Sequence, residues 1–318
     1  MIYYLPLEHL EMRYTTHLDR DIRKYLKDNN IQHTIIEPEK IDKITVGSFL
    51  DTGTTIMSKS KQIYCLAELY RQGKMQDNDV IFTTDLWFTG IESIAYLNYF
   101  YNKKTKIKGI IHAGSFTDTD FVRDMERWAK LFEDMIFDIS DTIYVASDFI
   151  AKDIYKKRLI SKDKIVVTGL PLDFEELNKY KNNSEKENIV IFNGRNVDEK
   201  QPWLFDELKN KFKNIKFINT QKENLSKRDY YKLLSKSKAV VSFALQENFG
   251  YGIQEAVYLG CIPIVPNRLV YKEQFDIKYR YNNFEDCINK VSLVFNNELK
   301  IPDLQLNDNN NIFKKWFN

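Results

Sequence analysis

The stretch QENFGYGIQEA, residues 246–256, sets two carboxylates, Glu247 and Glu255, around a pair of glycines. A helix is expected to begin near Phe249–Gly250, and the unpaired N–H groups of a helix N-terminus bind anions. Two carboxylates repel an anion, but they accept hydrogen bonds from hydroxyl groups. The segment therefore fits a ligand that carries both an anionic group and hydroxyls. The alternative is structural, with Asn248 as the helix N-cap and Glu255 as an exposed helix residue.

A second candidate segment is FNGRNVDEKQP, residues 192–202, which follows an expected strand and leads into a helix near Pro202. Gly194 permits close approach of the backbone to a ligand. Arg195 and Lys200 place two cations at the carboxyl end of the strand, where a forked guanidinium and a compact ammonium suit a diphosphate. The alternative is an ordinary surface loop with two solvated charges.

Together the two segments resemble a known family. Along the chain come Gly-Arg, four residues and Lys; then Glu, seven residues and Glu, with FG between them; and then GCIPIVP (260–266). This order of motifs is similar to the C-terminal half of retaining GT-B glycosyltransferases. The resemblance covers about residues 165–297. It implies that Arg195 and Lys200 hold the diphosphate of a nucleoside-diphosphate sugar, a UDP-sugar by expectation. These cations and a helix N-terminus would stabilise the leaving diphosphate without a metal, and no further cofactor is expected.

The resemblance also gives roles to the carboxylates and to one histidine. Glu247 would contact the transferred sugar, helped by the backbone amides of 248–250, and Glu255 would bind the ribose hydroxyls. His112, in IIHAGSF, is similar to the N-terminal-domain histidine that meets the donor sugar. Retention in this family is ascribed to same-face attack, which needs no protein nucleophile, whereas a two-glutamate glycosidase would need no diphosphate site. The candidate catalytic residues are Glu247, His112, Arg195 and Lys200, and the candidate donor-binding residues are Gly194, Arg195, Lys200, Asn248, Phe249, Gly250 and Glu255.

Short apolar runs alternate with amphipathic stretches along the chain, which is typical of parallel βαβ units. This predicts an α/β protein of two doubly wound Rossmann-like domains that face a central cleft. Residues 1–170 would form an N-terminal acceptor-side domain and residues 171–300 a C-terminal nucleotide-sugar-binding domain. Residues 301–318 would form a tail whose helix packs back on the body, with an amphipathic membrane anchor as the alternative.

The individual elements follow from the same alternation. Strands are expected within 2–5, 33–37, 79–84, 107–114, 142–147, 164–173, 189–194, 215–220, 239–245 and 260–266, and helices within 61–73, 120–135, 201–212, 226–237, 250–259 and 283–296. The loop 6–20 contains no glycine, whereas many family members carry a glycine-rich loop at this place. The glycine-bearing stretch 46–55 is the expected substitute for that loop. Trp87, between Asp85 and Phe88, is either an aromatic platform for a sugar or base or a core residue.

The bulk composition narrows the class of protein. The chain has 318 residues, 43% hydrophobic and 29% charged, and a net charge of +2, which does not by itself indicate nucleic-acid binding. Three isolated cysteines and four scattered histidines form no metal-ligand spacing, so no metal site is expected. The triplets at 77–79 and 118–120 are interpreted as surface acids. No apolar run reaches membrane-spanning length and no signal peptide is evident, so a cytoplasmic location, in a bacterium or a virus-infected cell, is expected.

The sequence indicates the acceptor less clearly than the donor. PLEHLEMRYT (6–15) and DLWFTGIE (85–92) are similar to stretches in glycosyltransferases of bacterial viruses, which makes a hydroxymethylated pyrimidine in DNA a candidate acceptor. The lysine clusters at 103–108 and 152–158 would then contact phosphates, or else are solvated faces. A cell-surface saccharide or lipid-linked sugar is the rival acceptor, and a non-catalytic nucleotide-sugar-binding module is the third hypothesis.

Overall fold

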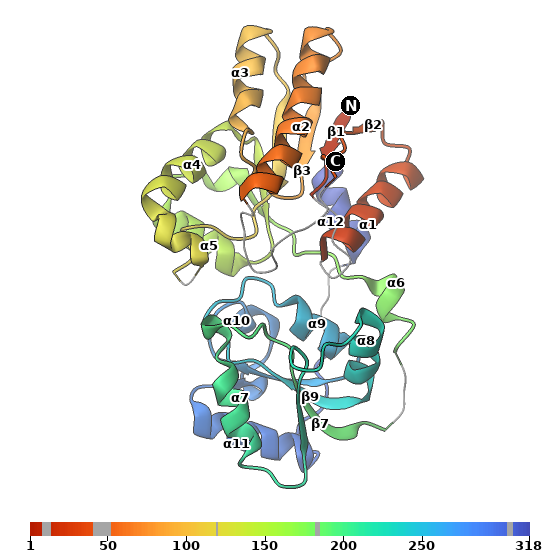
Figure 1. Ribbon diagram of the computed structural model, residues 1–318, viewed down its shortest axis with the longest axis vertical. Helices are drawn as coiled ribbons and strands as arrows, with labels where there is room; N and C mark the ends of the chain where they lie inside the picture. Colours follow the sequence, from red (N-terminus) through yellow and green to blue (C-terminus); the bar gives the residue numbers. More distant parts are fainter. Residues whose placement is uncertain (8–13, 41–51, 119, 182–184, 304–307) are drawn as a thin grey trace. The chain divides into compact units, whose positions relative to one another are not determined.

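The computed structural model describes residues 1–7, 14–40, 52–118, 120–181, 185–303 and 308–318 (Figure 1). The chain divides into two compact units. The first comprises Met1–Ala146, Ala151–Leu170 and Asp308–Asn318, and the second comprises Ser147–Ile150 and Pro171–Asn307. Each unit has its own parallel sheet, as the alternation of apolar runs predicts.

In the described part of the first unit, six parallel strands form one sheet in the order β2-β1-β3-β4-β5-β6. The strands are β1 (Ile2–Leu5), β2 (His33–Ile35), β3 (Val80–Thr83), β4 (Lys106–Ile110), β5 (Thr142–Val145) and β6 (Ile165–Val167). In β1, β3 and β5 nearly every side chain is buried. Continuous burial is what a parallel sheet covered on both faces requires.

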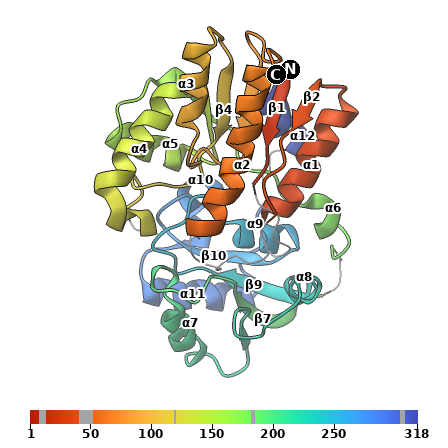
Figure 2. The same ribbon diagram turned by 45° about the horizontal axis from the view of Figure 1, so that its top comes forward.

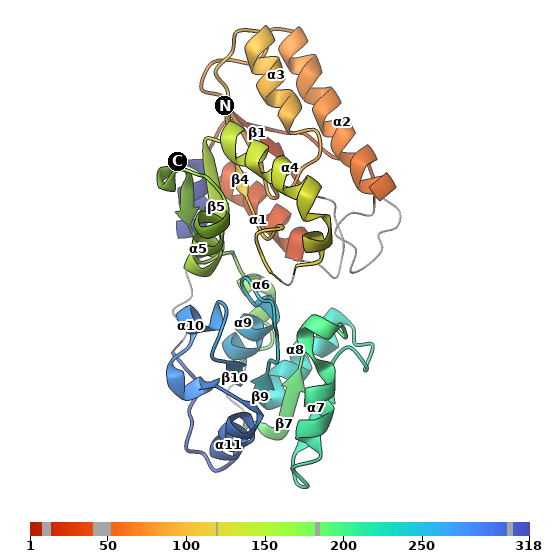
Figure 3. The same ribbon diagram turned by 90° about the vertical axis from the view of Figure 1, so that its left-hand side faces the viewer.

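The helices of the first unit are α1 (Tyr14–Asp28), α2 (Thr52–Arg71), α3 (Glu92–Phe100), α4 (Glu126–Ile139), most of α5 (Asp148–Lys157) and α12 (Asn309–Phe317), with short 3-10 turns η1 (Phe121–Met125) and η2 (Lys162–Lys164). The step from β1 to β2 runs along the sheet in the opposite direction to the steps from β2 through β5. Right-handed crossovers therefore place α1 on one face and α2, α3 and α4 on the other. Figure 3 shows α2 and α3 side by side, with α4 next to them.

The C-terminal helix α12 belongs to the core of the first unit, beside α1 (Figure 2). Trp316 is fully buried, and its Nε1 donates to Thr168 Oγ1 at 3.2 Å. Phe313 is also buried and lies against Tyr25 of α1, with ring centroids 5.4 Å apart. The tail thus presents its largest apolar side chains to the interior of this unit and not to a membrane.

In the second unit, five parallel strands are seen among the described residues, in the order β11-β10-β9-β7-β8. They are β7 (Glu187–Phe192), β8 (Lys216–Asn219), β9 (Ser237–Val241), β10 (Ile262–Pro266) and β11 (Arg280–Tyr281). The helices are α6 (Phe174–Leu177), α7 (Pro202–Lys209), α8 (Lys227–Lys236), α9 (Tyr251–Tyr258), α10 (Tyr271–Gln274) and α11 (Phe284–Phe295), with 3-10 turns η3 (Asp198–Lys200) and η4 (Ile277–Tyr279). The segments that lead into α7 and α9 follow adjacent strands, β7 and β9, so both leave the same edge of the sheet.

Several sequence expectations differ from the structure. The expected loop 6–20 is a loop only in part, because residues from Tyr14 onward form α1, and 8–13 lie outside the described residues. The glycine-bearing stretch 46–55 is likewise described only from Thr52, where α2 begins. The expected elements did not include helices α1, α3, α5, α6 and α10 or the two-residue strand β11. No described helix is long and apolar enough to cross a membrane.

Candidate active site

The loop after β7 is shaped around one glycine and one buried lysine. A Cβ at Gly194 would lie 2.9 Å from the ring of Phe192 and 3.4 Å from Lys200 Cβ, so a larger residue would displace the loop. The chain then makes the 3-10 turn η3 and passes through Gln201, whose φ is +49°, into α7, which has proline in its first turn. This turn directs Lys200 inward, where only 8% of the residue is exposed.

Lys200 joins the loop after β7 to the loop after β9. Its ammonium donates to the backbone carbonyl of Gln246 and lies 3.2 Å from Glu247 Oε2. The backbones also meet directly, because Leu245 N donates to Glu199 O at 2.7 Å. Residues 192–202 and 245–256 are therefore joined directly by side-chain and backbone hydrogen bonds.

Glu247 is held by its own loop as well as by Lys200. Its Oε1 accepts a hydrogen bond at 3.0 Å from the backbone N–H of Gly250, which precedes α9 as the N-cap with φ of +76°. A left-handed conformation at this position favours glycine. Asn248 is not the N-cap, so the structural alternative for that residue is wrong, and the carboxylate of Glu247 is fixed between a cation and a helix N-terminus.

Beside these groups lies a pocket of about 50 Å³. It is lined by Phe192, Asn193, Gly194, Lys200, Val241, Ser242, Glu247, Gly252, Ile253 and Tyr271. The lining thus brings together the Lys200 ammonium and the first turn of α9, which attract an anion, and the Glu247 carboxylate, which accepts from hydroxyls. Of the residues expected from the sequence, Gly194, Lys200 and Glu247 line this pocket.

The other expected residues of the second unit lie around the pocket without lining it. Arg195 is half exposed, and its guanidinium pairs with Glu199 Oε1 at 2.6 Å. Asn248 is buried. Phe249 is half-buried and lies edge-on to Tyr251, with ring centroids 4.8 Å apart. Arg195, which was expected to bind the diphosphate, thus has Glu199 as an ion-pair partner. This contact was not expected from the sequence.

Glu255 lies one turn further along α9 and faces α8. Tyr231 donates its hydroxyl hydrogen to Glu255 Oε1 at 2.8 Å, and the side chain is half-buried. Burial raises the pKa of the Glu255 carboxyl to about 7, and the hydrogen bond from Tyr231 offsets only part of that rise. Burial together with the neighbouring Glu255 charge raises the pKa of Tyr231 in turn. The two glutamates of the motif therefore occupy different environments.

Asn193, which was not identified from the sequence, connects the loop after β7 to α9. Its Nδ2 donates to the carbonyl of Gly252 at 2.7 Å and to Tyr230 Oη at 3.0 Å. A Cβ on Gly252 would lie 2.8 Å from that same Nδ2, so glycine is needed where the β7 loop and α9 meet. The available signal was the position of Asn193 immediately before the Gly-Arg pair.

In the first unit, His112 follows β4. Its Nε2 lies 2.8 Å from the carbonyl oxygen of Thr84, so Nε2 carries the hydrogen, and its ring lies 5.4 Å from that of Tyr14. The loop after it is anchored by Glu133 of α4, whose carboxylate accepts from Ser115 N at 2.6 Å and from Ser115 Oγ at 2.8 Å. The buried guanidinium of Arg158 completes this anchor at 2.7 Å from Glu133 Oε2.

Trp87 and Phe88 are core residues, which decides between the two alternatives for that segment. Trp87 Nε1 donates to Glu133 Oε1 at 3.2 Å, and its ring packs against those of Trp128 and Phe132. A residue with this burial cannot offer its face to a ligand. The platform interpretation of Trp87 is therefore wrong.

The acidic triplets have structural partners. Asp77 accepts from Lys104 N, Asp79 pairs with the N-terminal ammonium, Asp118 pairs with Lys157, and Asp120 accepts from Val122 N as the N-cap of η1. Residue 119 lies outside the described residues. Across the described ranges, no group of three or more His, Cys, Asp or Glu side chains is placed to hold a metal ion.

The lysine-rich stretch 152–158 is partly internal. Lys157 donates to the carbonyl of Phe116 at 2.6 Å, and Arg158 is the buried partner of Glu133. Two of its four cations therefore support the His112 loop and are not available to a phosphate backbone. The stretch 103–108 differs, because Lys104 and Lys106 are exposed.

No protein-family model matches the sequence. A tRNA-queuosine alpha-mannosyltransferase of Drosophila melanogaster is 37% identical over 68 residues, which are 21% of this chain and 18% of that enzyme. The match thus spans less than a fifth of the relative's length.

Solved structures resemble the chain over its whole length. Sucrose-phosphate synthase of Thermosynechococcus elongatus has a TM-score of 0.64 at 11% identity, covering 100% of this chain and 94% of that chain. The Anabaena protein HepE in complex with UDP has a TM-score of 0.61 at 10% identity, covering 99% and 95%. A glycosyltransferase from Rickettsia africae has a TM-score of 0.58 at 14% identity, covering 99% and 93%. The chain has the GT-B fold of these proteins.

Proposed function

We propose that the chain is a glycosyltransferase that moves a sugar from a nucleoside-diphosphate sugar to a hydroxyl group, with retention of the anomeric configuration. The observation that carries the proposal is the pocket where the Lys200 ammonium, the first turn of α9 and the Glu247 carboxylate converge. The GT-B fold and the local match to an alpha-mannosyltransferase support it.

The arrangement suits the departure of a diphosphate. Cleavage of the glycosidic bond leaves negative charge on the phosphate oxygen, which Lys200, Arg195 and the N–H groups of the first turn of α9 stabilise. Positive charge grows on the sugar ring, and Glu247 orients a sugar hydroxyl beside it. The acceptor hydroxyl attacks from the face that the diphosphate leaves, and the departing oxygen takes its proton, so no residue is assigned as a nucleophile.

We infer that the donor is a UDP-sugar. The Anabaena protein of the same fold is solved in complexes with UDP, UDP and glucose, and UDP-glucose. Glu255 accepts from the ribose hydroxyls in this assignment, while His112 contacts the transferred sugar. Donor binding needs no divalent metal, because the cations and the helix N-terminus supply the positive field.

We propose a modified base in a nucleic acid as the acceptor. The locally matching relative is named for a tRNA nucleoside. Two N-terminal segments resemble stretches in glycosyltransferases of bacterial viruses, and some viral enzymes glycosylate hydroxymethylated pyrimidines in DNA. The two sources, DNA and RNA, share the required chemistry, which is a hydroxyl group attached to a base. A saccharide acceptor is an outcome of the test.

The test is a donor-by-acceptor screen read by mass spectrometry, with UDP- and GDP-sugars against hydroxymethylated DNA, tRNA and simple saccharides. We expect a hexose mass added to a nucleic acid, and UDP binding by calorimetry that persists in EDTA. Binding that disappears with EDTA would refute the metal-free donor site, and transfer to saccharides alone would refute the acceptor.

The variants Glu247→Gln and Glu255→Gln test the two proposed roles. Loss of Glu255 should weaken donor and free UDP alike, by about 1.5–3 kcal/mol for a charged hydrogen bond, mainly as a higher KM. Loss of Glu247 should lower kcat and leave UDP affinity nearly unchanged. Glu223→Gln, at an exposed turn, is the matched control. Equal loss of UDP affinity in both variants would refute the division of roles.

A further inference from the structure

The first unit carries an exposed aromatic surface outside the proposed donor site. Among the described residues, the four most exposed aromatic side chains are Tyr64, Tyr96, Tyr99 and Phe100, with 62–81% of each exposed. Tyr64 belongs to α2 and the other three to α3, and these two helices are neighbours. We call these four residues the aromatic patch.

The rings of α3 form one continuous surface. The centroids of Tyr96 and Phe100 lie 4.5 Å apart, and those of Tyr99 and Phe100 lie 5.2 Å apart with an edge-to-face geometry. Such a surface exposes π-faces at adjacent positions, which suits flat ligands that stack. Exposed aromatic residues that are grouped in this way mark a binding surface, whereas single ones do not.

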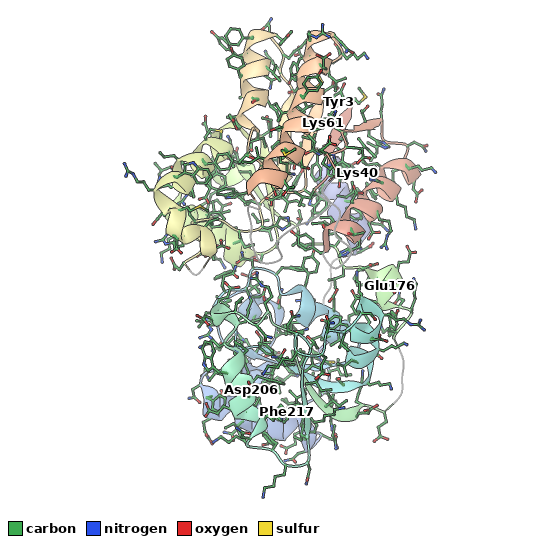
Figure 4. The ribbon with its side chains drawn as sticks, viewed as in Figure 1. Tyr3, Lys40, Lys61, Glu176, Asp206 and Phe217 are labelled. Carbon is green, nitrogen blue, oxygen red and sulfur yellow. The ribbon has the colours of Figure 1, made fainter. Side chains whose placement is uncertain are left out.

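Cations accompany the aromatic patch. Lys103 and Lys104 follow α3 directly, and Lys61 projects from α2 with its Nζ 5.9 Å from the Tyr64 ring centroid (Figure 4). Within the described ranges, none of these three ammonium groups has a carboxylate within 4.0 Å.

Three carboxylates adjoin this surface, and each has a partner. Asp77 accepts from Lys104 N at 2.8 Å. Glu68 pairs with Arg71 at 2.7 Å, and Glu92 accepts from Gly90 N at 3.1 Å. With Arg71, four cations face these three carboxylates, so the local charge is positive and fits an anionic partner.

We propose that the aromatic patch and its three lysines dock a single-stranded or looped segment of a nucleic acid. Bases stack on Tyr96, Tyr99 and Phe100, and phosphates meet the lysine ammonium groups. This rests on the proposed function, since it supplies a second contact for a nucleic-acid acceptor.

The chemistry of the patch distinguishes this partner from two others. Every member is an aromatic ring and three of the four carry a hydroxyl, whereas a helix that enters a bilayer needs a broad apolar face with aliphatic side chains. A second copy of the chain would bring like-charged lysines together at a symmetric interface.

The test is fluorescence anisotropy with a short labelled single-stranded oligonucleotide and with tRNA, over a range of salt concentrations. The double variant Tyr99→Ala/Phe100→Ala should weaken binding about ten-fold or more, because it removes two rings on which bases stack. Lys103→Ala/Lys104→Ala should reduce the slope of log K against log salt by about 1.4, since each single-strand phosphate contact contributes about 0.7. Trp203→Ala removes a 49% exposed aromatic of the second unit and should change neither quantity.

Further measurements separate this proposal from the proposed function. Patch variants should bind UDP normally and transfer sugar to a nucleoside-sized acceptor at the wild-type rate, while KM for a polynucleotide rises. Patch-dependent nucleic-acid binding without any transfer to nucleic acids would refute the acceptor and keep the docking surface. Unchanged nucleic-acid affinity in the patch variants would overturn the docking surface, as would patch-dependent binding to anionic vesicles only or patch-dependent dimerisation in its place.

Discussion

Replacement of Glu133 by alanine should destabilise the first unit by an amount that its burial determines. Glu133 and Arg158 are both almost completely buried, and their charged groups lie 2.7 Å apart. The carboxylate also accepts hydrogen bonds from Trp87 and from the backbone and hydroxyl of Ser115. Removal of Glu133 leaves the buried Arg158 with one remaining carboxylate neighbour, Asp134, whose Oδ1 lies 3.6 Å from Arg158 Nε. Loss of one partner of a buried ion pair costs about 3–5 kcal/mol. We expect the free energy of unfolding to fall by that amount.

The same helix offers a matched control. Lys130 and Asp134 of α4 form an ion pair at 2.5 Å, but 48% and 37% of their side chains are exposed. Solvent screening and side-chain entropy limit such pairs to about 1 kcal/mol or less. Lys130→Ala should therefore cost a small fraction of what Glu133→Ala costs, although the two pairs are similar in geometry.

Urea denaturation followed by tryptophan emission measures both variants, because three of the four tryptophans, Trp87, Trp128 and Trp316, belong to this unit. The double variant Glu133→Met/Arg158→Met should recover much of the lost stability, since it leaves no buried charge. It should still turn over slowly, because Ser115 loses the acceptor that fixes the loop after His112. If Glu133→Ala is no more destabilising than Lys130→Ala, the buried pair does not hold this loop and the reasoning is wrong.

Three further predictions concern the second unit. The pKa of Glu255 is about 7 in the folded state, above the usual value of 4.5, so protonation of Glu255 stabilises the folded state at low pH. This contribution to the free energy of unfolding is lost as pH rises through 7. Donor affinity should rise over the same range as Glu255 ionises, and calorimetry on Glu255→Gln should show a flat profile. Lys200→Met should weaken UDP binding about ten-fold or more in the same assay, because a charged hydrogen bond is lost. Gly252→Ala should weaken UDP binding because its Cβ meets Asn193 at 2.8 Å, and the double variant with Asn193→Ala should relieve that clash; equal affinities in the single and double variants would contradict this.

Ten of the eleven described strands were predictable, because most of them are short apolar runs between polar stretches. The helix α9 was expected to begin near Phe249–Gly250, and it begins at Tyr251, because the glycine that precedes it is a strong local signal. Helix α1 was missed because the absence of glycine in 6–20 was interpreted as an unusual loop. The strand β11 has only two residues, too few for a period to be detected.

The side-chain environments could not be predicted from the local sequence. Trp87 at the end of a strand has the same local pattern whether it faces a ligand or the core, and only the packing of α4 decides. Arg195 and Glu199 are four residues apart in a stretch without regular helical spacing, so their ion pair depends on the conformation of the η3 turn. Asn193 contacts Gly252, which is 59 residues away, so no local motif contains that contact.

In the proposed function the two glutamates of the motif have different hydrogen-bonding tasks at one helix. Glu247 precedes α9, where the Gly250 N–H at 3.0 Å and the Lys200 ammonium at 3.2 Å fix the orientation of its carboxylate. Glu255 lies inside α9, away from that cation, where burial favours the neutral form and Tyr231 donates to it. A carboxylate clamped beside the expected diphosphate site can act on the bond that breaks, whereas a carboxyl that titrates near pH 7 can hold hydroxyls that do not react. Spacing of eight residues along one loop and helix provides both environments while Lys200 anchors the loop, so we expect that neither glutamate can substitute for the other.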